Sequence, residues 1–263
     1  MNDYPPYDEL LTFAEGLADI SRQLLSKAFV SRPSIQIKDD NSYVTQFDKS
    51  IEETFRNLIG DKYKDHGILG EEFGSINVDA EFVWVLDPID GTAQFIAGLP
   101  VFGTLIGLAW KGRPFLGVID HPATNDRWVG VADGFAMHNE KSISTSKCKD
   151  FESAFVTCSN PDFMSDEELD KFARIREKAT YVQYGGSCFA YGLLASGRTD
   201  LAIDSSFAPF DFFANAAVIS GAGGILSNWD GEEVTLNWTG GILAAGDKSI
   251  HQKAVSIQLH TCQ

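Results

Sequence analysis

WVLDPIDGTAQF, residues 84–95, closes an apolar run with two aspartates, Asp87 and Asp90, then turns on a glycine before a second apolar run begins. The aromatic and β-branched residues of 81–88 predict a strand that ends at the proline, because proline cannot donate to a sheet ladder. A helix that begins near Thr92 would point free N–H groups and the positive end of its dipole back at the turn. The segment therefore predicts a ligand site where a strand ends and a helix begins, as in α/β proteins.

The two aspartates are anions, so they can hold a phosphate only through a divalent cation. Hard carboxylate oxygens suit Mg²⁺, which keeps water and substrate phosphate among its ligands. Gly91 permits a tight turn and brings the backbone close to a bound anion. The alternative is a plain turn in which Asp90-Gly91 is favoured turn chemistry and Asp87 caps a helix. This segment alone leaves that alternative open.

Outward from this segment, hydrophobic spacing divides the chain into helices and strands. Period-3.6 patterns predict helices over residues 7–29, 51–59, 165–179, 188–197 and 210–224. Strands are predicted over residues 81–88, 101–110, 115–120, 126–134, 153–159 and 199–204, with a short apolar run at 66–74. Gly/Pro turns join the strands of the first half, which predicts consecutive antiparallel pairing. Ser165 is expected to be an N-cap, and the glycines of 221–224 a helix C-cap. The mixture predicts an α/β protein with layered sheets and helices.

The composition limits the possible partners. The chain has 263 residues, 44% of them hydrophobic, and 37 acidic against 21 basic residues give a net charge of −16. Such a charge disfavours nucleic acid and anionic membrane as partners. The sequence shows no signal peptide and no apolar stretch of membrane-spanning length. The cysteines form no zinc-like spacing, so we expect reduced thiols in a cytoplasmic protein: Cys148, Cys158, Cys188 and Cys262.

Three more carboxylates lie in similar contexts. Glu71 follows a short apolar run, Asp211 begins an apolar helix, and Asp48 precedes the helix of 51–59. Each of them alone is explained as a surface acid or a helix start. Together with the two aspartates of 84–95 they form a set of five acids without histidine or cysteine at metal-ligand spacing. That set predicts an oxygen-only Mg²⁺ site.

Three motifs in order, GEE (70–72), WVLDPIDGTAQF (84–95) and PFDFFANAAVISGAGG (209–224), strongly resemble the inositol monophosphatase family of Mg²⁺-dependent, lithium-sensitive phosphatases. The resemblance runs from about Lys38 to Gly246. It implies a layered α-β-α-β-α sugar-phosphatase-like fold, with a mixed, largely antiparallel N-terminal sheet and a second, smaller sheet. It also implies one domain over 1–263, built of two packed halves at about 1–150 and 151–263, and a homodimer.

The resemblance assigns roles position by position, with two or three Mg²⁺ ions per site. The implied metal ligands are Glu71, Asp87, the backbone carbonyl of Ile89, Asp90 and Asp211. The implied catalytic residues are Glu71, Thr92 and Asp48, of which Thr92 and Asp48 orient and deprotonate the attacking water. Gly91 and Thr92 match the phosphate-binding turn. Gln94 and Phe210 depart from the family pattern, but neither position supplies a metal ligand.

Within the family, residues 98–130 and 185–204 are most similar to the histidinol-phosphate phosphatase branch. Ser187 departs from that branch, which places an aspartate there to face the cationic amino group of the substrate. A serine hydroxyl can accept a hydrogen bond from an ammonium but cannot neutralise it. Asp204 is therefore a second candidate for the ammonium or for a hydroxyl. The implied substrate-binding residues are Lys38, Asp90, Gly91, Thr92, Gly185, Gly186, Ser187, Asp204 and Asp211.

The sequence favours a phosphate monoester hydrolase acting on histidinol phosphate by metal-assisted attack of water. An inositol 1-phosphate phosphatase, or a broad polyol or sugar phosphatase, is the alternative. A nucleotide 3′-phosphatase or a fructose 1,6-bisphosphatase would need additional basic or aromatic residues that the sequence does not show. A non-catalytic metal-dependent binding protein would be expected to have lost an acid or Thr92, yet all these positions are intact.

Overall fold

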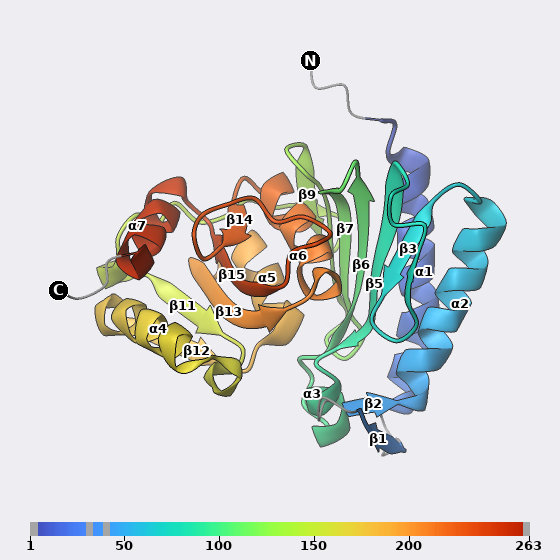
Figure 1. Ribbon diagram of the computed structural model, residues 1–263, viewed down its shortest axis with the longest axis horizontal. Helices are drawn as coiled ribbons and strands as arrows, with labels where there is room; N and C mark the ends of the chain where they lie inside the picture. Colours follow the sequence, from blue (N-terminus) through green and yellow to red (C-terminus); the bar gives the residue numbers. More distant parts are fainter. Residues whose placement is uncertain (1–4, 30–33, 39–42, 260–263) are drawn as a thin grey trace.

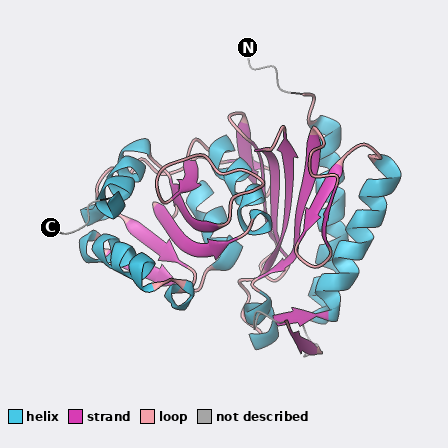
Figure 2. Ribbon diagram, in the orientation of Figure 1, coloured by secondary structure: helices cyan, strands magenta, loops and turns pink. Residues whose placement is uncertain are grey.

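The computed structural model describes residues 5–29, 34–38 and 43–259, which form five alternating layers of helix and sheet (Figures 1 and 2). The α/β class and the α-β-α-β-α order predicted above are confirmed. The layers, in order, are α1 (Asp8–Ala28) with α2 (Gln46–Lys62), an eight-stranded sheet, α5 (Ser187–Ala195) with α6 (Pro209–Gly221), a five-stranded sheet, and α4 (Asp166–Lys178) with α7 (Lys248–Leu259).

The eight-stranded sheet has the order β10-β9-β8-β7-β6-β5-β3-β4. All neighbouring strands are antiparallel except β3 and β5, so the sheet is mixed and largely antiparallel, as predicted. Its strands are β3 (Gly67–Gly70), β4 (Gly74–Ile76), β5 (Phe82–Asp90), β6 (Gly103–Trp110), β7 (Arg113–His121), β8 (Asp126–Val131), β9 (Phe135–His138) and β10 (Lys141–Ser142). The centre of the sheet is covered on both faces, which explains the continuous apolar runs of β5, β6 and β7.

The five-stranded sheet has the order β12-β11-β13-β15-β14, with β11 parallel to both of its neighbours. Its strands are β11 (Phe155–Cys158), β12 (Tyr181–Tyr184), β13 (Leu201–Phe207), β14 (Ile225–Asn228) and β15 (Gly240–Ala245). Three smaller pieces complete the fold near the lower end of the large sheet in Figure 1: β1 (Ile35–Ile37), β2 (Tyr43–Thr45) and α3 (Thr92–Ala97). Short 3₁₀ turns occupy Phe151–Ser153 and Pro161–Phe163.

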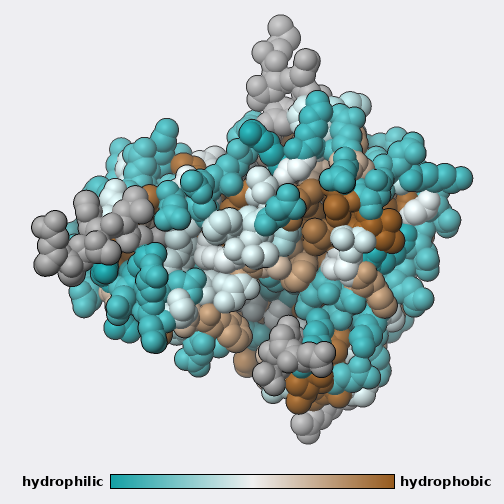
Figure 3. Space-filling model, in the orientation of Figure 1, coloured by the Kyte–Doolittle hydropathy of each residue, from teal (hydrophilic) through white to brown (hydrophobic). Residues whose placement is uncertain are grey.

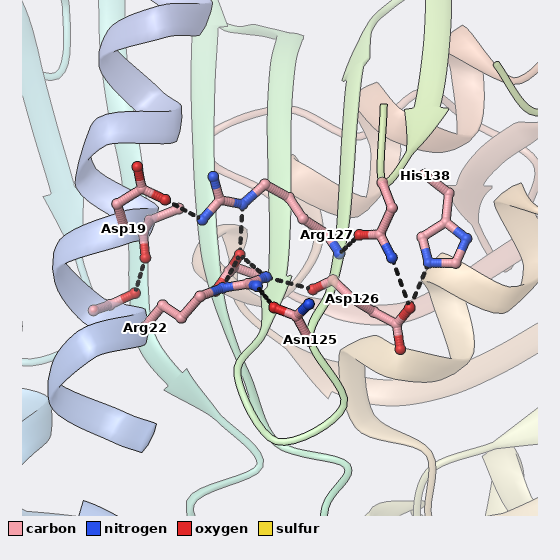
Figure 4. A network of polar contacts seen from close by, with 10 residues as sticks. Asp19, Arg22, Asn125, Asp126, Arg127 and His138 are labelled. Atoms are coloured by element: carbon pink, nitrogen blue, oxygen red, sulfur yellow. Dashed lines mark hydrogen bonds and ion pairs between the residues drawn. The ribbon is translucent and has the colours of Figure 1, made fainter. Parts of the chain in front are cut away.

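An ion-pair network centred on one buried carboxylate joins α1 to the large sheet (Figure 4). The Asp120 carboxylate on β7 is completely buried and accepts hydrogen bonds from Arg22 of α1, at 2.7 Å, and from Arg127 of β8, at 2.6 Å. Arg127 also reaches Asp19 of α1 at 2.7 Å, and Arg22 contacts Asn125. The two guanidinium groups satisfy an acid that would be costly to bury alone.

The strand of 81–88 does not end where the sequence predicted. β5 continues through Pro88 to Asp90, and its register with β6 shifts between Asp87 and Asp90. The proline lies inside that irregularity, where no ladder hydrogen bond is required of it. Both aspartates therefore lie at the C-terminal end of β5, an interior strand of the sheet.

Most other elements agree with the sequence pattern to within a few residues. Ser165 caps α4 in a capping box with Glu168, and α6 ends at Gly221, with Gly223 in the left-handed region at φ 89°. The sequence did not predict helix α7, nor the short strands β1, β2, β4, β9, β10, β12, β14 and β15. Such short strands carry little period-2 signal, and tertiary packing decides them.

The described surface matches the composition. Hydrophilic residues dominate the face in Figure 3, with an apolar cluster over the large sheet. Among the described residues, no helix has the length and apolar content needed to span a bilayer. Cys148, Cys158 and Cys188 are free thiols, and Cys262 lies outside the described residues.

Candidate active site

The site begins at the irregular end of β5. Gly91 follows Asp90 with φ 78° and ψ 42°, a left-handed conformation that glycine adopts without steric cost, and it caps α3. A Cβ atom on Gly91 would lie 3.0 Å from the Ser187 Oγ atom. The turn therefore favours glycine, and a side chain at this position would also crowd the Ser187 hydroxyl. The Asp87 side chain folds back on the same turn and accepts a hydrogen bond from the Ile89 N–H at 3.0 Å.

Asp211 comes from the other side, at the third position of α6. Its Oδ2 atom accepts a hydrogen bond from the Ala208 N–H at 2.7 Å, which fixes the carboxylate at the helix start. Oxygen atoms of Asp87, Asp90 and Asp211 lie within 4.8 Å of one another. Two elements far apart in sequence thus bring three of the carboxylates that the sequence singled out to one point.

This convergence is electrostatically unfavourable in the protein alone. Burial raises the pKa of Asp87 well above its usual range, and the charges of Glu71, Asp90 and Asp211 raise it further. Burial likewise raises the pKa of Asp211 and of Asp90. Buried like charges are tolerated where a cation balances them, and an all-oxygen set fits Mg²⁺ better than softer metals. The donor set therefore fits the cation that the sequence predicts.

Glu71 joins the cluster from the turn after β3, and a lysine partly neutralises it. The Lys38 ammonium lies 2.8 Å from a Glu71 oxygen and 2.7 Å from a Glu72 oxygen. Burial opposes the charge on Lys38, but the hydrogen bonds and charges of the two glutamates outweigh it and raise the pKa of the ammonium. Burial raises the pKa of Glu72 to about 7, although Lys38 opposes the shift. Lys38 thus lies at the cluster, with its ammonium bound to two acids.

Asp48 and Thr92 form a separate pair beside the cluster. Thr45, the N-cap of α2, donates from its N–H at 2.8 Å and from its hydroxyl at 2.6 Å to one Asp48 oxygen. The other Asp48 oxygen lies 3.3 Å from the Thr92 hydroxyl, which also lies 3.0 Å from the Ile89 carbonyl. Burial raises the pKa of Asp48, against the hydrogen bonds of Thr45. The pair predicted for water activation is therefore in hydrogen-bond contact.

A family model described as the inositol monophosphatase family matches residues 6–261. The chain belongs to the inositol monophosphatase family. It is 40% identical to the bifunctional phosphatase IMPL2, chloroplastic, of Arabidopsis thaliana, over 96% of this chain and 76% of that protein. It is 30% identical to a histidinol-phosphatase of Chlorobaculum parvum, over 82% of this chain and 85% of that protein.

The fold agrees with this assignment. An inositol monophosphatase structure from Zymomonas mobilis superposes with a TM-score of 0.88 at 35% identity, covering 97% of this chain and 99% of that one. Membership makes this protein a phosphoric monoester hydrolase, in a family that is Mg²⁺-dependent in general. In this phosphatase the three converging aspartates lie at the end of β5 and at the start of α6.

The N-terminal end of α5 closes the phosphatase site in a way the sequence did not predict. The Cys188 N–H donates to the Asp90 carboxylate at 2.6 Å, so the start of this helix holds a carboxylate of the cluster. The Cys188 Sγ atom lies 3.2 Å from Nε2 of His121, a buried imidazole whose pKa burial lowers to about 3. His121 therefore stays neutral behind the carboxylate cluster.

Three of the predicted substrate-binding positions lie in the same region. Gly185 has φ 83° and Gly186 caps α5, while Ser187 has φ 45°, is 8% exposed and faces Gly91. Ser187 is the first residue of the helix, and Gly186, not the serine, is its cap.

Asp204 is more enclosed than a substrate ligand usually is. It is 3% exposed and accepts hydrogen bonds from the Ser159 N–H at 2.6 Å and the Tyr191 hydroxyl at 2.8 Å. Burial raises its pKa to about 6, with hydrogen bonds opposing and the charge of Asp90 adding to the shift. Its role in substrate binding remains a prediction.

Glu52 is a further residue of the phosphatase site that the motifs did not identify. It is completely buried on α2, pairs with Arg56 at 2.7 Å, and accepts hydrogen bonds from the Glu72 N–H at 2.8 Å and the Phe73 N–H at 3.2 Å. It therefore anchors the turn that carries Glu71. A signal was present in the sequence, because Glu52 occupies the apolar face of the helix of 51–59, where an acid requires a partner.

Proposed function

We propose that this phosphatase hydrolyses histidinol phosphate in a Mg²⁺-dependent reaction in which water attacks the phosphorus directly. The observation that carries the mechanism is the convergence of Asp87, Asp90 and Asp211 beside the Thr92–Asp48 pair. Two or three ions would be held by these aspartates, by Glu71 and by the Ile89 carbonyl. When bound, Mg²⁺ supplies charge neutralisation of the phosphate and a lowered pKa for a coordinated water.

The residues of this chain orient and deprotonate that water. The Thr92 hydroxyl has one proton and two acceptors, Asp48 and the Ile89 carbonyl. If the Ile89 carbonyl held an ion, the Thr92 proton would be left to Asp48, and the Thr92 oxygen could accept a hydrogen bond from water. The proton of the attacking water then passes through Thr92 to Asp48. The raised pKa of Asp48 makes this carboxylate a better proton acceptor than an ordinary aspartate.

The turn at Gly91 and Thr92 is proposed to receive the phosphate. Lys38 contributes a positive charge at the edge of the acidic cluster. This charge reduces the repulsion between the carboxylates and a dianionic phosphate ester. On the far side of the turn, Gly185, Gly186 and Ser187 are proposed to face the alcohol part of the ester. Asp204 is proposed to act there through the loop that its carboxylate holds.

The preference for histidinol phosphate is supported by the similarity of residues 98–130 to that branch and by the relative named histidinol-phosphatase. An inositol 1-phosphate substrate is the second candidate. Ser187 favours this second candidate, because a neutral hydroxyl gives no ionic preference for an ammonium over a sugar hydroxyl. We further propose a cytoplasmic homodimer of one-domain protomers that uses no nucleic acid, and inhibition by lithium at a metal position.

Steady-state kinetics on both esters with Mg²⁺ test the substrate. We expect a higher kcat/KM for histidinol phosphate than for myo-inositol 1-phosphate. A higher value for the inositol ester would reverse the ranking, and turnover of neither ester would overturn both candidates. Deleting the gene in its host and testing for a histidine requirement examines the same point in the cell.

A further inference from the structure

Three glycines lie side by side across the middle of the large sheet. Gly107 of β6 pairs in register with Gly117 of β7, and Gly117 pairs in register with Gly130 of β8. They will be called the glycine row. All three have negative φ values, so no backbone turn explains why glycine occupies these positions.

The reason is the helix above them. A Cβ atom on Gly117 would lie 2.2 Å from the Ala214 carbonyl oxygen of α6, and one on Gly130 would lie 2.6 Å from the Val218 Cα atom. A Cβ on Gly107 would lie 3.0 Å from the Phe213 Cβ atom and 3.1 Å from the Ala214 backbone nitrogen. The backbone of α6 thus rests on the strands themselves, and no flexible side chain is available to yield.

This contact fixes the position of Asp211. Asp211 stands three residues before Ala214 on α6, whereas Asp87 and Asp90 belong to β5, which pairs with β6 in the same sheet. The height of α6 over the sheet therefore sets the separation between the carboxylate of Asp211 and the other two. A helix and a strand that carry ligands for one ion have to be held to a fraction of an ångström.

We propose that Gly117 and Gly107 are positioning residues for the cation site, because they set how closely Asp211 approaches Asp87 and Asp90. The proposal rests on the metal-dependent function proposed above. To relieve the 2.2 Å contact at Gly117, α6 has to move outward by about 1.3 Å to reach a normal separation of about 3.5 Å. Displacing the Asp211 carboxylate by such a distance is expected to weaken Mg²⁺ binding by about 10–100-fold. Mutations that remove a residue orienting a metal ligand have effects of this size.

Gly130 provides a matched control. It belongs to the same row and meets the same helix at 2.6 Å, but at Val218, seven residues after Asp211. Gly130→Ala is expected to strain the C-terminal part of α6, around Val218, and to leave the end that carries Asp211 in place. Both Gly117→Ala and Gly130→Ala are expected to lower the thermal midpoint of the protein without Mg²⁺, because both overpack the core.

The experiment measures Mg²⁺ affinity by titration calorimetry, and separately the Mg²⁺ concentration for half-maximal phosphatase activity. We expect Gly117→Ala to weaken both by at least about tenfold, with kcat at saturating Mg²⁺ largely recovered, and Gly130→Ala to change neither by more than about twofold. Equal weakening in both variants, or a lower thermal midpoint in Gly117→Ala with unchanged affinity, would overturn the proposal.

Gly107→Ala is the second variant, for the case in which Gly117→Ala does not fold. Its contact at 3.0 Å is milder, and it lies against the same turn of α6, so a smaller loss of Mg²⁺ affinity in the same direction is expected. No loss in a folded Gly107→Ala protein would count against the proposal. The wild-type protein separates the two hypotheses: if it binds no Mg²⁺ and hydrolyses no phosphate ester, the proposed function fails before any glycine is tested.

Discussion

Asp87→Asn should make the metal-free protein more stable while abolishing its activity. Asp87 is completely buried among like charges, and its neighbours Asp90 and Asp211 have oxygen atoms within 4.8 Å. An asparagine keeps the shape of the side chain and can still accept the hydrogen bond from the Ile89 N–H. The asparagine removes the charge of Asp87, and therefore removes the repulsion between Asp87 and the neighbouring carboxylates in the protein without a cation.

The magnitude follows from the geometry. Two unit charges 4.8 Å apart repel by about 3.5 kcal/mol at an effective dielectric constant of about 20. Proton uptake by the cluster relieves part of this repulsion, so we expect a net gain of about 2 kcal/mol in the free energy of unfolding near pH 8. For a protein of this size the thermal midpoint would then rise by about 4–8 °C.

The pH dependence gives the sign of the effect. The pKa of Asp87 is raised in the folded state above the value of about 4 in the unfolded chain. The folded state of the wild type therefore binds more protons than the unfolded state. The stability that the proton on Asp87 provides is complete below pH 4 and is lost as the pH rises through the raised pKa. The advantage of the asparagine variant should be near zero at pH 4 and should grow toward pH 8.

Thermal melts in EDTA between pH 4 and pH 9 measure this difference. Adding Mg²⁺ should stabilise the wild type more than the variant, because a cation at 100 times its dissociation constant contributes about 2.7 kcal/mol. The order of the two midpoints should then reverse. A variant that melts below the wild type in EDTA at pH 8, or a difference that does not change with pH, would refute a cluster strained by its own charge.

Three further substitutions test other parts of the structure. Thr92→Val removes the hydroxyl between water and the Asp48 carboxylate, so kcat should fall by about 10²-fold with the Mg²⁺ requirement unchanged, as single-turnover kinetics would show. Ser187→Asp restores a charge beside the turn, and kcat/KM for histidinol phosphate should rise by about tenfold relative to myo-inositol 1-phosphate; equal changes for both esters would place the residue outside the alcohol site. Asp120→Ala leaves the Arg22 and Arg127 guanidinium groups without their shared partner, and denaturant unfolding should show a loss of about 3 kcal/mol with kcat nearly unchanged.

The sequence predicted the α/β class because apolar periodicity is a local pattern, which identifies α1 and α6. The five-layer order and the roles of the site residues were implied by the resemblance to the family, and the acids at strand ends and helix starts indicated where carboxylates gather. The predicted end of β5 was wrong because a proline normally closes a strand. Here a register shift between β5 and β6 accommodates Pro88 inside the strand. Glu52 and the Cys188 N–H were missed because their partners lie about 20 and 98 residues away along the chain, so no local spacing reveals them.

The motifs alone do not determine the geometry of the carboxylate cluster. One part, from Asp87 to Thr92, is built by the irregular end of a strand, and the other, Asp211, by a helix cap 120 residues later. Strand pairing does not join α6 to β5, so the separation of these two parts depends on how α6 packs on the sheet. Each motif fixes the direction of its own carboxylates, but the distance between them follows from the glycines beneath the helix. Changing the packing should therefore alter metal affinity even when every residue of the motifs is intact.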